Sequence, residues 1–299
     1  METRDLLQRL KTIPISTDKL AEHLLSGNFN SVFKGQGIEF DEIRHYQCGD
    51  DIRSIDWNAS ARFSVPFVKM YREERDLTIL ILLDISASMD RESRNQRLTP
   101  FEQGVLASAI ISFSAEQKSQ RTGALLFDDG VYKVFLPARG RPHLLSLFGS
   151  ALRYRNQGQA DVLRNKNAGS NIGAALAGAA RLLKRRSLIV LVSDFFSIGW
   201  EDQLSRLCRK HDVIALRVSD PDDMELPALG LIQMEDPETG LRITASSMFK
   251  SFHNDWKEWH EQRAQYCAKI CTGAGAVYLE LPVTADAARE LYRLFSRNY

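Results

Sequence analysis

An uninterrupted apolar run that stops on an aspartate constrains the fold more than any other feature of this sequence. The run covers residues 77–83, is rich in leucine and isoleucine, and ends at Asp84. Because it does not alternate with polar residues, both faces of the strand are expected to be buried, as in the centre of a parallel sheet. Residues 187–193 form a second, largely apolar run that ends at Asp194. Parallel strands end at one edge of a sheet, so we expect both aspartates there, where open α/β sheets bind ligands.

Predicted strands and helices alternate along residues 77–299. One helix start is clear, because Thr99 can cap it, Pro100 suits its first turn and Glu102 completes a capping box. This order predicts an α/β fold with a doubly wound, mostly parallel, Rossmann-like sheet. Helices are predicted at 99–118, 143–154, 200–210 and 247–271, with one more entered through the loop at 169–176 and a last one from 284. Strands are predicted at 123–127, 131–136, 213–218 and 276–281, of which the first two form an edge hairpin. A second small hairpin is predicted within 229–243.

Residues 1–76 form a predicted small amino-terminal extension of the α+β kind. It holds a short helix at 17–26 and a strand at 67–75. Between them, residues 38–57 mix charged with aromatic and aliphatic side chains. Two interpretations stay open: a salt-bridged surface that fastens the segment to the main domain, which the composition favours, and a docking surface for a partner. The candidate partner-binding residues are Arg44, Asp50, Asp51, Arg53 and Asp56.

Charge and cysteine content exclude several classes of function. The formal net charge of +1 gives no general attraction to nucleic acid. The sequence has no run of about 18 apolar residues, so no membrane span is expected. The charged first residues lack the apolar core of a signal peptide. The cysteines form no Cys-x-x-Cys pair and are expected to be free thiols in a cytoplasmic protein; they are Cys48, Cys208, Cys267 and Cys271.

Three hydroxyl groups can join the two aspartates in a metal site. Ser86 and Ser88 follow Asp84 at every second position, and in an extended loop alternate residues point the same way. Ser170 or Asn171 would cap the Ala-rich helix that follows, and capping and metal binding by Ser170 do not exclude each other. These hard oxygen donors suit Mg²⁺, with Mn²⁺ or Ca²⁺ as alternatives. Without a metal, the same residues would form a hydrogen-bonded loop.

The strand end at Asp84 resembles a known metal site. Residues 84–88, Asp-Ile-Ser-Ala-Ser, are similar to the Asp-x-Ser-x-Ser signature of the von Willebrand factor type A (vWA) domain and its metal-ion-dependent adhesion site. That site also takes a threonine from a loop before a helix and an aspartate after a later strand, and Ser170 and Asp194 stand in those places. Phe195 stands where glycine is usual. The resemblance implies a vWA-like fold and a metal whose shell an Asp or Glu carboxylate of a partner completes, with the ligands Asp84, Ser86, Ser88, Ser170 and Asp194.

A second resemblance covers the chain from about residue 28 to 220. Residues 33–42 (FKGQGIEFDE) and 46–58 (YQCGDDIRSIDWN), followed by the Asp-x-Ser-x-Ser strand end, are similar to the bacterial domain-of-unknown-function family fifty-eight. The resemblance implies a partner or adaptor of a MoxR-type AAA+ ATPase in protein assembly or remodelling. No enzymatic activity is established for that family. We therefore expect a metal-dependent protein–protein interaction module without catalytic residues.

Two other functions stay open. A metal-dependent phosphoester hydrolase would use the same Asp84 edge and would need more carboxylates, for which Asp128 is a candidate. A purely structural domain would not respond to metal at all. A serine hydrolase is not indicated, because Gly169-Ser170-Asn171 does not fit the Gly-x-Ser-x-Gly elbow of that class.

Overall fold

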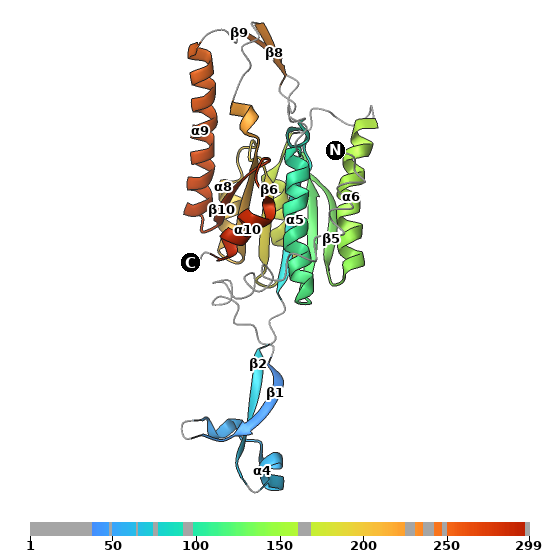
Figure 1. Ribbon diagram of the computed structural model, residues 1–299, viewed down its shortest axis with the longest axis vertical. Coiled ribbons are helices and arrows are strands. Elements are labelled where there is room, and N and C mark those ends of the chain that lie inside the picture. Colours follow the sequence, from blue (N-terminus) through green and yellow to red (C-terminus); the bar gives the residue numbers. More distant parts are fainter. Residues whose placement is uncertain are drawn as a thin grey trace. The chain divides into compact units, whose positions relative to one another are not determined.

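The larger unit of the chain is built around a sheet with β3 (Thr78–Asp84) at its centre. The chain divides into a small unit, Asn30–Asp76, and a larger unit that holds the remaining residues, and Figure 1 labels several elements of each. The helix predicted at 17–26 lies outside the described residues. The computed structural model describes residues 38–47, 50–63, 65–73, 77–91, 98–160, 169–224, 231–235, 242–246 and 250–296.

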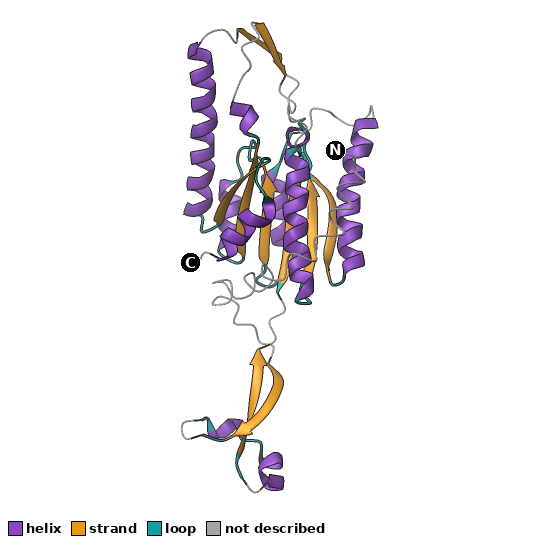
Figure 2. Ribbon diagram, viewed as in Figure 1, coloured by secondary structure: helices purple, strands orange, loops and turns teal. Residues whose placement is uncertain are grey.

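Among the described residues, five strands of this sheet run parallel and one edge strand runs antiparallel. The strand order is β10-β7-β6-β3-β4-β5, and only the β4–β5 pair is antiparallel. The structure confirms the predicted doubly wound, mostly parallel sheet and the edge hairpin; Figure 2 shows the helices on both sides of it. The strands besides β3 are β4 (Arg121–Phe127), β5 (Val131–Ala138), β6 (Leu188–Ser193), β7 (Asp212–Ser219) and β10 (Val277–Pro282).

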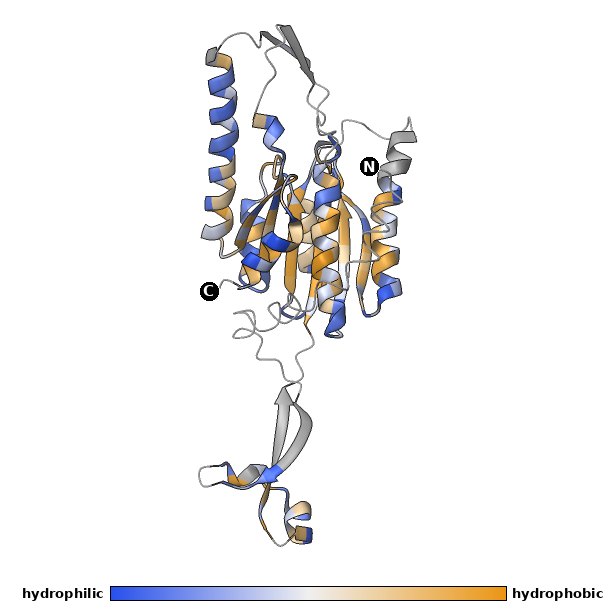
Figure 3. Ribbon diagram, in the orientation of Figure 1, coloured by the Kyte–Doolittle hydropathy of each residue, from blue (hydrophilic) through white to orange (hydrophobic). Residues whose placement is uncertain are grey.

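Strand β3 is buried on both faces, as its unbroken apolar run predicts. The side chains of residues 79–83 are fully buried. Strands β4 and β6 flank them, with Leu82 opposite Leu125 on one side and Leu191 on the other. The strands of this sheet are coloured hydrophobic in Figure 3. Full burial of an aliphatic side chain contributes about 1.5–3 kcal/mol, so the register of β3 is firmly set and Asp84 is carried to the carboxyl edge of the sheet.

Among the described residues, three helices cover each face of the sheet. Helix α5 packs against α6 and α10, while α8 packs against α7 and α9. Each lies where the sequence predicts a helix. None of the helices within the described ranges combines the length and the apolar character that crossing a membrane requires. The helices are α5 (Pro100–Gln117), α6 (Arg141–Ala160), α7 (Ile172–Leu182), α8 (Glu201–Cys208), α9 (Lys250–Gly273) and α10 (Ala287–Ser296).

The start of α5 has the predicted capping box. Thr99 Oγ1 accepts a hydrogen bond from Glu102 N at 3.2 Å, and Glu102 Oε2 accepts one from Thr99 N at 3.0 Å. One turn further on, a Cβ atom added to Gly104 would lie 2.9 Å from Val192 Cγ1. The absence of a side chain at Gly104 therefore lets α5 pack directly on β6, next to the strand end that carries Asp194.

A side chain at Gly123 in β4 is expected to destabilise the protein. The β4–β5 register shifts between Thr122 and Ala124, and a Cβ atom at Gly123 would lie 2.7 Å from Phe135 O in the backbone of β5. Gly123→Ala must push the edge strand away, so we expect it to lower the free energy of unfolding by about 1–3 kcal/mol in urea denaturation. The control Gly130→Ala, with no atom within 4 Å of the added carbon, should cost less than about 0.5 kcal/mol. Equal effects of the two variants would contradict this account.

The small unit consists, in its described residues, of an antiparallel pair of strands and two short helices that lie between them in the chain. Strand β1 (Ile38–His45) pairs antiparallel with β2 (Phe67–Glu73). The helices are the 3-10 helix η2 (Ile52–Ser54) and α4 (Trp57–Phe63). The small α+β character of the extension is as predicted, and β2 lies where a strand is predicted at 67–75. The unit spans Asn30–Asp76 rather than the predicted 1–76, and β1, η2 and α4 fall where no element is predicted.

Two further sequence predictions are confirmed in the larger unit. Strands β8 (Leu231–Glu235) and β9 (Arg242–Ser246) form an antiparallel pair. This is the predicted second hairpin, although its second strand extends beyond the predicted bound at 243. Cys267 and Cys271 on α9 are buried free thiols, and Cys208 is a half-buried one. The remaining cysteine, at position 48, lies outside the described residues.

Candidate metal and partner-binding site

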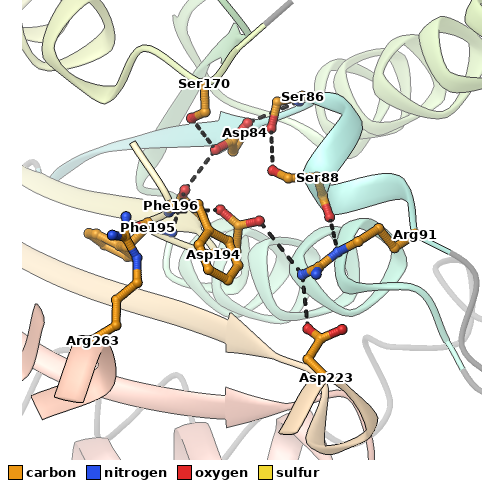
Figure 4. Close-up of polar contacts among 11 residues, drawn as sticks. Asp84, Ser86, Ser88, Arg91, Ser170, Asp194, Phe195, Phe196, Asp223 and Arg263 are labelled. Atoms are coloured by element: carbon orange, nitrogen blue, oxygen red, sulfur yellow. Dashed lines mark hydrogen bonds and ion pairs between the residues drawn. The ribbon is translucent and has the colours of Figure 1, made fainter. Parts of the chain in front are cut away.

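The carboxylate of Asp84 is the centre of a buried hydrogen-bond network at the carboxyl edge of the sheet. Asp84 is the last residue of β3 and is fully buried. Its Oδ1 accepts a hydrogen bond from Ser86 N at 2.9 Å. Its Oδ2 accepts hydrogen bonds from Ser170 Oγ at 2.7 Å and Ser193 Oγ at 2.6 Å, so loops from three parts of the chain meet at one carboxylate (Figure 4).

Ser193 belongs to this network, although the sequence analysis did not select it. It is the last residue of β6, and its hydroxyl both donates to Asp84 and accepts from Phe195 N at 3.0 Å. A serine at the end of an otherwise apolar, fully buried strand is the signal that could have found it, because a buried hydroxyl needs a partner.

The loop that carries Ser86 and Ser88 is not extended, and that prediction is wrong. Residues Ala87–Asp90 form the 3-10 helix η3, and Met89 N donates a hydrogen bond to Ser86 O at 3.2 Å, which closes the turn. The two hydroxyl oxygens nevertheless lie 3.1 Å apart. The tight turn thus brings Ser86 and Ser88 together beside Asp84 by a different route from strand alternation.

Asn171, rather than Ser170, caps helix α7. Asn171 Oδ1 accepts a hydrogen bond from Ala174 N at 2.9 Å. The hydroxyl of Ser170 points instead to Asp84, as Figure 4 shows. From the sequence, either residue could be the cap. In the structure Asn171 is the cap, and Ser170 contacts the carboxylate of Asp84.

Asp194 directly follows β6 and has one carboxylate oxygen that lacks a hydrogen bond. Its Oδ1 accepts from Phe196 N at 3.1 Å. Its Oδ2 is buried and has no hydrogen-bond partner among the described residues, and Arg91 Nη2 lies 3.9 Å from it. A buried carboxylate oxygen without a hydrogen bond is costly, so this oxygen marks a place where a cation would be stabilising.

Arg91 is a second residue that the sequence analysis missed. Its Nε donates to Ser88 O at 2.7 Å, and its Nη2 forms an ion pair of 2.9 Å with Asp223 Oδ2. Figure 4 shows the guanidinium between Asp194 and Asp223. No pattern in the sequence links Arg91 to Asp223, because the contact depends on the tertiary fold.

The electrostatics of the site favour binding of a cation. Burial, followed by the charge of Asp194, raises the pKa of Asp84 to about 7, although the hydrogen bonds from three serines act in the opposite direction. Two buried carboxylates therefore repel each other in the metal-free protein. No group of three or more His, Cys, Asp or Glu side chains within the described ranges could hold a metal. A metal here would depend on hydroxyl oxygens, which fits Mg²⁺ better than zinc.

Phe195 occupies the place where the vWA pattern has glycine, and its backbone keeps a glycine-like shape. Its φ is 59°, in the left-handed region that side chains rarely adopt. The ring is fully buried and lies edge-on to Trp200, with ring centroids 5.3 Å apart. Packing of the aromatic ring thus holds a loop conformation that the backbone alone would disfavour.

Phe195→Gly is expected to destabilise the protein despite relieving the backbone. The loss of a buried phenyl ring costs about 3–5 kcal/mol, while relief of the left-handed conformation returns about 1–2 kcal/mol. We expect a net loss of roughly 1–4 kcal/mol in chemical denaturation. The control is Ser119→Gly, because Ser119 is also left-handed (φ 56°) but exposed, and it should gain stability. A Phe195→Gly variant as stable as the wild type would contradict the packing argument.

The candidate partner-binding residues of the small unit mostly hold that unit together. Arg44 forms a two-pronged ion pair with Asp50, at 2.8 and 2.6 Å, and Asp56 Oδ1 accepts hydrogen bonds from the first turn of α4. Asp51 is exposed, and the side chain of Arg53 lies outside the described part. Large apolar side chains are also exposed on this unit, namely Ile52, Trp57, Phe63 and Val65.

Asp128, the further ligand that a hydrolase would need, is bound within the protein. Its Oδ2 accepts a hydrogen bond from Tyr154 Oη at 2.6 Å, and its backbone oxygen accepts from Asn171 N at 2.6 Å. Asp128 thus supports the loop before α7 from the turn between β4 and β5.

The sheet and the strand-end site together define the class of the larger unit: it is an α/β domain of the vWA-like kind, with the Asp-x-Ser-x-Ser loop at the end of its central strand. The chain belongs to the family described as Protein of unknown function DUF58, whose model matches residues 42–265. This is the family fifty-eight that the motifs at 33–42 and 46–58 predict.

The chain is also similar to individual relatives and solved structures. An uncharacterized protein of Mycobacterium bovis is 29% identical over 290 residues, which cover 96% of this chain and 88% of the relative. An uncharacterized protein of Mycobacterium avium is 36% identical over 124 residues, 41% of this chain and 73% of that protein. Among solved structures, the conserved hypothetical protein BatB from Bacteroides thetaiotaomicron is 18% identical with a TM-score of 0.45, over 74% of this chain and 98% of BatB. The SpRpn10 VWA domain is 15% identical with a TM-score of 0.39, over 72% and 93%.

Proposed function

We propose that the chain is a metal-dependent protein–protein interaction module that binds Mg²⁺ at the edge of β3 and β6. The observation that carries the proposal is the buried Oδ2 of Asp194, which has no hydrogen-bond partner among the described residues and faces the same edge as Asp84. Mn²⁺ or Ca²⁺ would be alternatives. The proposed ligands are Asp84, Ser86, Ser88, Ser170 and Asp194.

The chemistry of the ligands supports binding rather than catalysis. Three of the five proposed ligands are neutral hydroxyls, and the two carboxylates only balance the charge of a bound Mg²⁺. Five protein ligands would leave one of its six positions exchangeable for a carboxylate of a partner. Asp84 and Asp194 would supply the negative charge that holds the ion, and the hydroxyls of Ser86, Ser88 and Ser170 would be oriented toward it. A phosphoester hydrolase is the less supported alternative, because Asp128 is hydrogen-bonded to Tyr154.

The partner is proposed from the family resemblance. A MoxR-type AAA+ ATPase, or a client protein that offers an Asp or Glu carboxylate, would complete the metal shell. The proposal places this interaction in the cytoplasm, where free thiols such as those of Cys267 and Cys271 are usual.

Calorimetry with Mg²⁺ and Mn²⁺ tests the proposal directly. We expect one binding event for the wild type and none for Asp84→Ala, because that variant loses the carboxylate at the centre of the network. Circular dichroism of both proteins verifies that the fold is kept. Equal binding by the two proteins would place the metal elsewhere, and the absence of binding by the wild type would reject the metal site.

A further inference from the structure

An aromatic side chain lies directly beside the proposed metal site. Phe196 N donates to Asp194 Oδ1, so Phe196 is tied to a proposed ligand. Its ring stacks with Trp259 on α9, with ring centroids 6.0 Å apart and an interplanar angle of 11°. The guanidinium groups of Arg91 and Arg263 lie 5.4 and 5.1 Å from the centre of the Phe196 ring. Aromatic and cationic groups therefore meet next to the site.

Hydrogen bonds to α9 hold this arrangement in place. Arg263 Nη2 donates to Phe195 O at 2.7 Å and also lies 3.4 Å from Ser197 O. Trp256 Nε1 donates at 2.7 Å to Asp223 O, which lies within the 3-10 helix η4 (Pro221–Met224). The loop after β6 and the loop after β7 are thus both attached to α9, so a surface formed by them is preorganised for binding.

Two apolar side chains near Phe196 are open to solvent. Trp259, which stacks with Phe196, is 47% exposed, and Ile198, two residues further along the same loop, is 86% exposed. Together with the partly buried Phe196, these two side chains are called the aromatic rim. Large apolar side chains exposed beside a buried polar site are typical of an interaction surface, and aromatic residues and arginine are enriched in the centres of protein interfaces.

We propose that the aromatic rim binds an apolar side chain that neighbours the metal-binding carboxylate of a partner, so that the recognised element is an acidic and apolar segment of a protein. This inference rests on the proposed metal-dependent function and adds the chemistry of the partner. An acidic segment suits this surface, because the guanidinium groups of Arg91 and Arg263 lie over the Phe196 ring, beside the proposed divalent ion.

Selection from a random-peptide display library on the immobilised full chain tests the inference. The selection is made in Mg²⁺, and the bound peptides are eluted with EDTA. We expect the enriched peptides to share an Asp or Glu with a Leu, Ile, Phe or Trp at a fixed spacing. For a synthetic copy of one enriched peptide, Ile198→Ser and Trp259→Ser should each weaken binding at least about ten-fold. The control is Leu136→Ser on β5, which is 65% exposed on another part of the unit and should leave binding unchanged.

Three outcomes would overturn the inference: enriched peptides with an acidic residue but no apolar neighbour, binding that survives both rim variants, and no enrichment at all. Because Ile198 lies in an exposed loop, its replacement by serine does not threaten folding. Calorimetry with Mg²⁺ on Ile198→Ser separates the two proposals. If Ile198→Ser still binds both Mg²⁺ and the peptide as the wild type does, only the role of the aromatic rim is rejected. If the wild type binds no Mg²⁺, the proposed metal-dependent function is rejected, and the role of the rim with it.

Discussion

Replacing Asp84 with Asn is expected to stabilise the metal-free protein at pH 8 and to abolish its stabilisation by Mg²⁺. Asp84 is fully buried, and its pKa is about 7 in the folded protein against 3.8 as the reference value. Between these two values the folded state binds a proton that the unfolded state has released. The stability of the wild type therefore falls as the pH rises from about 4 to about 7, and above pH 7 the cost reaches roughly 4 kcal/mol.

The Asn side chain keeps the shape of the carboxylate but carries no charge. Its amide must face the hydroxyls of Ser170 and Ser193, which can reverse their roles and accept, so we expect a gain of roughly 2–4 kcal/mol at pH 8 after this rearrangement. Urea denaturation in EDTA at pH 4.5, 6 and 8 measures this gain in the free energy of unfolding. When the series is repeated in Mg²⁺, only the wild type should become more stable. The matched control is Asp286→Asn at the exposed start of α10, because Asn caps a helix about as well as Asp. An Asp84→Asn protein less stable than the wild type at pH 8 in EDTA would contradict the burial argument.

Replacing Arg91 with Ala is expected to tighten the binding of Mg²⁺ about ten-fold. Arg91 places a positive charge 3.9 Å from Asp194 Oδ2, the oxygen proposed to bind the metal. In a partly exposed site, removal of that charge is worth on the order of 1–2 kcal/mol after screening. The metal-free protein should become less stable at the same time, because Asp223 and Asp194 lose their counter-charge.

Calorimetry on three proteins distinguishes this effect from a positioning role of Arg91. The control is Arg186→Ala, which removes another surface ion pair, the 2.7 Å contact with Asp212, and should leave the Mg²⁺ affinity unchanged. Weaker binding by Arg91→Ala would show that the hydrogen bond from Arg91 to Ser88 O matters more than its charge. Unchanged binding would show that the metal does not contact Asp194.

Local patterns predict much of this fold, because they report features that the chain settles over a few residues. The unbroken apolar run before Asp84 predicts a strand buried on both faces, and the Thr99–Glu102 capping box predicts the start of α5. The parallel sheet follows from the alternation of such segments. The meeting of Asp84 with Ser170 follows less directly, because it needs the vWA resemblance to connect residues far apart in the chain.

The parts of the site that escape prediction are those settled by tertiary contact. The prediction that Ser86 and Ser88 lie in an extended loop is wrong, because the chain forms the 3-10 helix η3 there, closed by a hydrogen bond from Met89 N. Ser193 and Arg91 carry no motif, and their roles depend on which loops the sheet brings together. The glycine-like backbone of Phe195 was not predictable either, because the ring's packing against Trp200 compensates for it.

The network around Asp84 also bears on when during synthesis the site can exist. The hydroxyls that bind its carboxylate lie 86 and 109 residues further along the chain. A nascent chain that ends before β6 would carry Asp84, Ser86 and Ser88 but neither Ser193 nor Asp194. The proposed metal site would therefore form only after β6 has been synthesised and has packed against β3. Incomplete chains would then lack the proposed binding of metal and partner, which only the finished protein would have.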